Sequence, residues 1–164
     1  MRAVLEGAAR LAVARAPRGA HPDRESGRSG AGARAARLIA AIVAGGAASR
    51  FAGEPKGLHT VGGQRIIDRI AAALTSVVPE LILITSAAGA ESWLPGVRVI
   101  PDAWRKQGSL VGIHTALRYA EQPILLVAWD MPFVTRALFE LLRDRAAQST
   151  YATVPEGPDC LEPF

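Results

Sequence analysis

The sequence has only one cysteine, Cys160, among its 164 residues. A lone cysteine cannot form a disulfide within the chain. Nor can it supply the ligands of a cysteine-built zinc site or an iron–sulfur cluster. Proteins without structural disulfides are typical of reducing compartments, so we expect a cytoplasmic location.

The sequence also lacks a long hydrophobic run. The longest apolar stretch, residues 38–48, has eleven residues and includes two glycines. A helix that crosses a bilayer needs about 18 apolar residues or more. We therefore expect a soluble protein with no membrane partner.

An excess of positive charge is found only near the N-terminus. The formal net charge is +4, and residues 1–36 account for it with seven arginines and three acidic residues. The remaining twelve of the nineteen basic residues balance the remaining twelve of the fifteen acidic residues. Because the excess does not lie on a folded face, we expect no nucleic-acid partner.

Residues 1–36 are rich in alanine, arginine and glycine and show no sustained hydrophobic periodicity after Val13. Such a composition buries too little apolar surface to fold, so we expect a disordered basic tail. The remaining residues, 37–164, belong to a chain that is 49% hydrophobic and of a length that suits one globular domain. We expect this domain to be a monomer.

Apolar runs alternate with helical periodicities along this domain. Continuous apolar runs are typical of strands buried on both faces, and apolar residues three or four apart are typical of amphipathic helices. We expect strands at residues 38–44, 81–85, 97–100, 124–128 and 151–154, and helices at 64–78, 110–117 and 134–142. The alternation predicts an α/β fold, a three-layer α/β/α sandwich with a mostly parallel sheet.

Ligands of such sheets bind at the carboxyl ends of the strands. In this chain the segments that follow the strands place glycine, arginine, lysine and aspartate side by side, at residues 45–56, 85–90, 102–112 and 130–133. We therefore expect the functional residues to lie in these four segments.

The first of these segments suits a phosphate. Gly45 and Gly46 allow the main chain to approach a ligand closely and to direct several N–H groups at one anion, while Arg50 and Lys56 add positive charge. The segment is neither a Walker loop nor a dinucleotide-binding fingerprint. The alternative is an ordinary turn with two solvated cations, and the added arginine and lysine favour phosphate.

The same segment resembles the signature loop of the MobA-like nucleotidyltransferases, the family that contains molybdenum cofactor guanylyltransferase. The resemblance spans residues 38–164 and rests on GGxxSRFxGxPK at 45–56, followed in the family's order by IPD at 100–102, GSLVGI at 108–113 and DMPF at 130–133. It implies a Rossmann-like sheet and the transfer of GMP from GTP to the terminal phosphate of molybdopterin, with release of pyrophosphate.

The resemblance also implies a role for individual residues. The family's pattern assigns Lys56 to the phosphates and Asp130 to Mg²⁺, and with Arg50 these are the expected catalytic residues. The full set of expected nucleotide-binding residues is Val43, Ala44, Gly45, Gly46, Lys56, Thr85, Asp102 and Asp130. Ser86 is an alternative to Thr85, because the register is open by one residue.

Other interpretations of these residues remain open. Asp130 follows a buried strand, where a carboxylate is costly unless it meets a cation, but Asp130-Met131-Pro132 is also typical of a helix start. Asp102 could be a turn residue. Ser109 could cap the helix that follows it or bring the helix N-terminus to an anion.

The chain departs from the family's pattern in three places. Ser109 replaces a proline, Trp129 replaces a small residue and could crowd the crevice or stack on a ligand, and the sequence ends at Phe164, before the acceptor-side residues of its relatives. The alternatives are therefore a non-catalytic GTP-binding remnant, or a cytidylyl or sugar-phosphate nucleotidyltransferase. The reaction needs no protein nucleophile, since a phosphate monoester is already largely dianionic at neutral pH.

Overall fold

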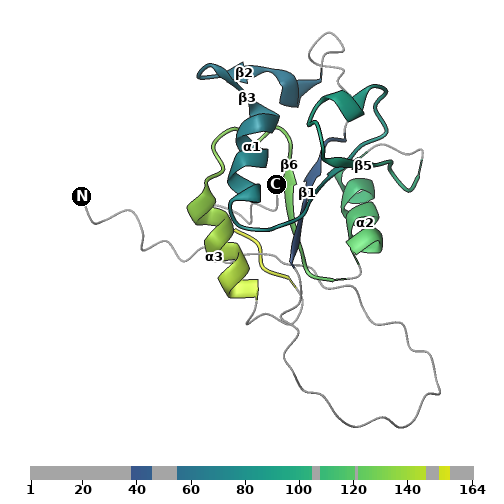
Figure 1. The fold of residues 1–164 in the computed structure, drawn as a ribbon. Helices are drawn as coiled ribbons and strands as arrows, with labels where there is room; N and C mark the ends of the chain where they lie inside the picture. Colours follow the sequence, from purple (N-terminus) through teal and green to yellow (C-terminus); the bar gives the residue numbers. More distant parts are fainter. Residues whose placement is uncertain (1–37, 46–54, 105–107, 121, 147–151, 156–164) are drawn as a thin grey trace, which may run out of the picture.

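The protein was analysed as a computed structural model, which describes residues 38–45, 55–104, 108–120, 122–146 and 152–155. The described part contains a parallel four-stranded sheet with the order β5-β4-β1-β6 (Figure 1). Its strands are β1 (Ile39–Val43), β4 (Leu81–Ile84), β5 (Arg98–Ile100) and β6 (Ile124–Ala128). The structure thus confirms the four strands that were predicted from these apolar runs.

The register brings the carboxyl ends of all four strands to one level. Val43 pairs with Ile84 on one side and with Ala128 on the other, and Ile84 pairs in turn with Ile100. Each of these four residues ends its strand. The segments that follow the strands therefore leave the sheet along a single edge.

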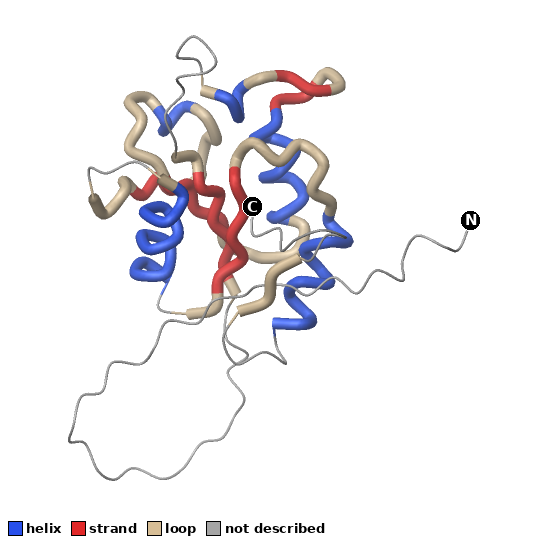
Figure 2. Tube along the Cα trace, turned by 180° about the vertical axis from the view of Figure 1, so that it is seen from behind, coloured by secondary structure: helices blue, strands red, loops and turns tan. Residues whose placement is uncertain are grey.

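Helices cover both faces of the sheet. Helices α1 (Ile66–Thr75) and α3 (Arg136–Ala146) lie on one face, and α2 (Ser109–Ala120) lies on the other (Figures 1 and 2). This arrangement confirms the predicted α/β sandwich with a mostly parallel sheet.

The core consists of two apolar clusters, one on each side of the sheet. All five residues of β1 are buried, and the side chains of residues 39–42 alternate between the two clusters. Ile42 packs in the cluster with the helices α1 and α3, whereas Ala41 packs in the cluster with α2. A strand buried on both faces needs a continuous apolar sequence, which explains the run from residue 38 to residue 44.

A short hairpin precedes the first helix. Strands β2 (Thr60–Val61) and β3 (Gln64–Arg65) pair antiparallel around Gly62 and Gly63, whose φ angles are 60° and 82°. Two consecutive positive φ angles suit glycine and form the tight turn that matches the twist of a hairpin. Because residues 64 and 65 belong to this hairpin, the helix predicted from residue 64 begins at Ile66.

The strand predicted at residues 151–154 is not found. Residues 152–154 have no strand structure in the part of the chain that is described, and Tyr151 lies outside it. Tyrosine and the β-branched Thr153 and Val154 favour a strand, but a strand also needs a hydrogen-bonded neighbour, and the described ladders pair β6 with β1 alone. The division into a tail at 1–36 and a domain at 37–164 stays a prediction, because residues 1–37 are not described.

Candidate functional site

Four short segments meet at the carboxyl edge of the sheet. Ala44 follows β1, Thr85 follows β4, Pro101 follows β5 and Trp129 follows β6, all one residue beyond partners in register. These are the segments in which the sequence predicted function. The topology therefore places most of the expected site residues along one edge of the sheet.

Lys56 and Asp130 lie side by side at this edge. Lys56 is the first residue of the 3-10 helix η1 (Lys56–Leu58), and Asp130 is the second residue after β6. The Nζ atom of Lys56 is 3.7 Å from Oδ2 of Asp130, and the two side chains are 34% and 46% exposed. Exposed ion pairs contribute only about 0–1 kcal/mol to stability. A cation and a carboxylate held at this distance in an accessible place suit a charged ligand better than a structural role.

The structure decides between the two interpretations of Asp130. Helix α3 begins six residues later, at Arg136, and the hydroxyl of Thr135 accepts a hydrogen bond from the N–H of Leu138 at 3.2 Å. Thr135, not Asp130, thus caps this helix, so the helix-start interpretation was wrong. The expected burial of Asp130 was also wrong, because its carboxylate lies beyond the buried strand and is nearly half exposed.

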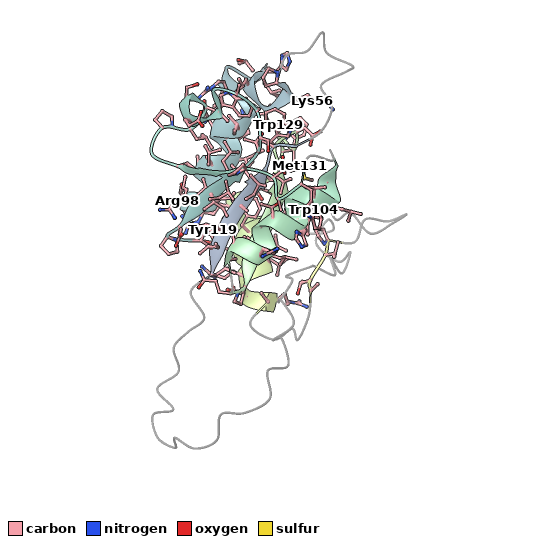
Figure 3. The ribbon with its side chains drawn as sticks, turned by 90° about the vertical axis from the view of Figure 1, so that its right-hand side faces the viewer. Lys56, Arg98, Trp104, Tyr119, Trp129 and Met131 are labelled. Carbon is pink, nitrogen blue, oxygen red and sulfur yellow. The ribbon has the colours of Figure 1, made fainter. Side chains whose placement is uncertain are left out.

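Trp129 is part of the core. Its side chain is buried, and its ring stacks on that of Trp93 with centroids 5.3 Å apart and planes 19° apart. Its backbone N–H donates to the carbonyl oxygen of Val43 at 3.2 Å, which extends the β1–β6 ladder past Ala128. Figure 3 shows Lys56 and Trp129 at the same end of the molecule. The sequence allowed Trp129 to crowd the nucleotide site or to stack on a ligand; its buried ring instead packs on Trp93.

The main chain after β1 becomes accessible only at its glycine. The carbonyl of Val43 accepts from Trp129, and the N–H of Ala44 donates to Ile84 at 2.9 Å, so both groups serve the sheet. A Cβ atom added to Gly45 would meet no described atom within 4 Å. Two further expected residues of this loop, Gly46 and Arg50, lie outside the described residues.

Along the half of this edge formed by β4 and β5, hydroxyl groups hold the loops. Thr85 is buried, and its hydroxyl accepts a hydrogen bond from the N–H of Ala87 at 3.2 Å. The hydroxyl of exposed Ser86 accepts from the N–H of Asp102 at 2.9 Å. This bond fixes the start of the Asp102 loop beside β4. Of the two alternatives for a polar nucleotide contact, Ser86 is the one with an exposed side chain.

Thr115 extends this hydrogen-bonded arrangement into α2. Its buried hydroxyl donates to the carbonyl of Val111 at 2.7 Å and accepts from the N–H of Ala103 at 2.9 Å. The loop after β5 is thereby attached to α2. The sequence analysis missed this residue. Its signal was a threonine on the apolar face of a helix, where a hydroxyl needs a partner.

Gly112 brings α2 close to the end of β1. A Cβ atom at this position would lie 2.3 Å from Cγ1 of Val43, which no real pair of carbon atoms tolerates. The contact therefore requires glycine. The GSLVGI block at residues 108–113 contains it, but the sequence alone did not indicate which strand it faces.

Arg65 connects the hairpin to the loop that contains Trp93. Its guanidinium donates two hydrogen bonds of 2.7 Å to the carboxylate of Asp68 and one of 3.0 Å to the carbonyl oxygen of Trp93. The hydrogen bond with Asp68 raises the pKa of the Arg65 guanidinium above its ordinary value. Arg65 thus remains charged and holds α1 and the tryptophan loop together.

The described residues contain no cluster of three or more histidine, cysteine, aspartate or glutamate side chains that could hold a metal ion. Magnesium does not need such a cluster, because it is commonly bound through one or two carboxylates together with substrate phosphates and water. The accessible carboxylate of Asp130 fits that pattern. Among the helices that the structure describes, none is long and apolar enough to cross a membrane.

Comparison with known proteins gives consistent matches. Residues 40–163 match the MobA-like NTP transferase domain family. The chain is 36% identical over 125 residues to the probable molybdenum cofactor guanylyltransferase of Pelotomaculum thermopropionicum, covering 75% of this chain and 60% of that protein. It is 29% identical to the molybdenum cofactor guanylyltransferase of Desulfosudis oleivorans, covering 75% and 61%. The chain thus spans about 60% of the length of these relatives.

Solved structures share the fold. Rv0371c from Mycobacterium tuberculosis has a TM-score of 0.54 at 23% identity, with 70% of this chain and 62% of that chain covered. The CMP:2-keto-3-deoxy-manno-octonic acid synthetase complexed with CTP has a TM-score of 0.59 at 18% identity, with 69% and 48% covered. At these identities the likeness concerns the fold alone.

Proposed function

Because the chain belongs to the MobA-like NTP transferase domain family, we propose that its site binds GTP with Mg²⁺ and transfers GMP to molybdopterin. The products are the guanine dinucleotide form of the cofactor and pyrophosphate. The choice of GTP and molybdopterin is supported by the names of its relatives, several of which are molybdenum cofactor guanylyltransferases. We place this reaction in the cytoplasm.

The observation that carries the proposal is the pairing of Lys56 with Asp130 at the carboxyl edge of a parallel sheet. A triphosphate bound with a metal ion presents negative charge and cationic charge within a few ångströms of each other. Lys56 offers an ammonium group to the phosphate oxygens, and Asp130 offers a carboxylate to the metal. The two side chains are thus complementary to the two parts of one ligand.

In this reaction the protein mainly has to position the two substrates and neutralise their negative charge. An oxygen of the acceptor's terminal phosphate forms a bond to the α-phosphorus of GTP, and the bond from that phosphorus to the bridging oxygen breaks. Pyrophosphate leaves with that bridging oxygen and its electron pair. Lys56 would stabilise negative charge that builds on the phosphates, and Mg²⁺ bound at Asp130 would supply further charge neutralisation. The chain need not activate a nucleophile.

Ser86 and Asp102 are the candidates for contacts with the rest of the nucleotide. They belong to neighbouring loops at the same edge and are joined by the hydrogen bond from the Asp102 N–H to the Ser86 hydroxyl. This bond holds the loops in a fixed relation before a ligand arrives, which lowers the entropy that binding must remove. We propose that they position the ribose or base over this edge of the sheet.

Calorimetric titration of the full chain with GTP, with and without Mg²⁺, tests the proposal. We expect Lys56→Ala and Asp130→Asn each to weaken Mg²⁺-dependent GTP binding by roughly a hundredfold, since each removes a charged partner of the ligand. Arg136→Ala is the matched control, because it removes an exposed charge on α3 that pairs with Glu140. Equal affinity in all variants would contradict the proposal.

A second assay tests the reaction itself. The chain is incubated with Mg²⁺, molybdopterin and one nucleotide at a time, GTP, CTP or ATP, and pyrophosphate release is measured. We expect release with GTP that depends on molybdopterin. Release with CTP alone would assign the site to a cytidylyl transfer, and binding of GTP without release would assign this chain a nucleotide-binding role only.

A further inference from the structure

Trp129 contacts both segments that supply the charged pair. It directly precedes Asp130 in the chain, and its indole lies against Gly57, the residue that follows Lys56. A Cβ atom at Gly57 would lie 2.6 Å from Cε3 and 3.0 Å from Cδ2 of Trp129, and 3.2 Å from its carbonyl oxygen. The main chain of η1 therefore rests directly on the benzo half of the indole.

Trp129 is itself packed against a second tryptophan, Trp93. Only 7% of Trp129 and 7% of Trp93 are exposed, and the two rings stack with centroids 5.3 Å apart. The carbonyl oxygen of Trp93 accepts a hydrogen bond from Arg65, whose guanidinium is fixed by Asp68. A continuous set of contacts thus leads from α1 through the tryptophan pair to η1.

The ion pair cannot define this geometry by its own strength. Both side chains are more than one third exposed, and exposed ion pairs are weak and are screened by salt. Lys56 also lies on a 3-10 helix of only three residues, which has little intrinsic rigidity. The packing beneath η1 is therefore the better source of a fixed separation between the ammonium and the carboxylate.

We infer that Trp129 is a positioning residue, whose stacked indole fixes the Lys56 segment relative to Asp130 for the metal-bound triphosphate. This inference rests on the proposed function of that pair. The indole is buried in the core of the molecule. It acts through Gly57 and the backbone that carries Lys56, and the ring of Trp93 stacks on it.

The experiment compares two substitutions of the same ring in the full chain. Trp129→Leu removes the stack and is expected to weaken Mg²⁺-dependent GTP binding by roughly tenfold, because a small misplacement of a binding group costs much of its contribution. Trp129→Phe keeps an aromatic ring on Trp93 and is expected to stay within about threefold of the wild type. Phe139→Leu is the control for lost core packing, because Phe139 is buried in the same cluster but on α3.

A double-mutant cycle with Lys56→Ala separates positioning from a general loss of stability. If Trp129 acts through Lys56, then Trp129→Leu changes the affinity less than about twofold once Lys56 is already alanine. If the double variant instead loses GTP affinity by the product of the two single losses, the inference is overturned. So would an equal loss of affinity in Phe139→Leu at a similar drop in unfolding midpoint.

Trp93→Leu provides the same test if Trp129→Leu does not fold. It leaves Trp129 and both charged residues in place but removes the support of the indole, and we expect a loss of affinity of roughly threefold to tenfold. Unchanged affinity in this variant would overturn the inference while leaving the proposed function intact. A wild-type chain that does not bind GTP with Mg²⁺ would instead refute the proposed function, and the inference with it.

Discussion

The two halves of the carboxyl edge of the sheet are held together by different forces. In the packed half, η1 and the segment after β6 are held by contacts among Gly57, Trp93 and Trp129. In the hydrogen-bonded half, the loops after β4 and β5 are held by single bonds to the hydroxyls of Ser86 and Thr115. Lys56 and Asp130 belong to the packed half, and Asp102 belongs to the other.

The two halves should therefore respond to different kinds of substitution. Packing contacts respond to volume, so that an added methyl group is as damaging as a removed one. Hydrogen bonds respond to single atoms, so that a side chain of equal shape but without the hydroxyl breaks them. The following substitutions test whether the two halves obey these separate rules.

Gly57→Val should have the largest effect on stability. The new Cβ would lie 2.6 Å from Cε3 of Trp129, and neither the buried ring nor the adjacent backbone can move freely. We expect a loss of about 3 kcal/mol in the free energy of unfolding, at the upper end of overpacking effects. Urea denaturation measures it. Gly45→Val is the control, because no described atom lies within 4 Å of its Cβ position.

Gly112→Ala should destabilise the chain by about 2 kcal/mol, because its Cβ would lie 2.3 Å from Cγ1 of Val43. Alanine favours a helix over glycine by up to about 1 kcal/mol, which offsets part of the clash. Adding Val43→Ala removes the clashing methyl group. The double variant should therefore recover stability relative to the sum of the two single effects in urea denaturation, and strict additivity would show that the two residues do not compete for space.

Thr115→Val tests the hydrogen-bonded half at its buried end. The shape is kept, but the bond from the N–H of Ala103 is lost, and we expect a loss of about 1 kcal/mol. Thermal unfolding measures this effect. Thr75→Val is the matched control, because the Thr75 hydroxyl also bonds within its helix but is exposed. A similar loss in both variants would mean that the contact to Ala103 contributes nothing.

Ser86→Ala should have the smallest effect on global stability, about 0.5 kcal/mol, because the site of the bond is exposed to water. The local effect is more informative. Loss of the acceptor of the Asp102 N–H should speed hydrogen exchange at that amide, since its protection depends on local opening. Ser76→Ala is the control, because Ser76 lies at the C-terminal end of α1 and its hydroxyl bonds to the carbonyl of Ala73. It should leave the exchange rate of the Asp102 amide unchanged.

Much of the fold could be predicted because a parallel sheet requires residues that are apolar on both faces. The strand predicted at 124–128 therefore coincides with β6, and the one predicted at 81–85 matches β4 to within one residue. The hairpin before α1 was missed, because strands of two residues have no measurable periodicity. Only Gly62-Gly63 signals the turn there.

The candidate site could be predicted in part. The order of strands and helices was sufficient to place Lys56 and Asp130 at the same edge, because parallel strands end together. The roles given to these residues stay predictions. The contacts of Trp129 with Gly57 and Trp93 could not be foreseen, since pairing between distant side chains depends on the tertiary fold and leaves no local pattern in the sequence.

The central place of β1 bears on how the chain reaches this structure. β1 is the first strand of the sheet along the chain, yet its register partners, such as Leu81 and Ile124, are made much later. During synthesis β1 cannot pair until β4 and β6 have been made, and its five apolar residues stay unpaired until then. Such distant pairings slow folding, so we expect refolding to be slow for a chain of this size and sensitive to chaperones that shield exposed strands.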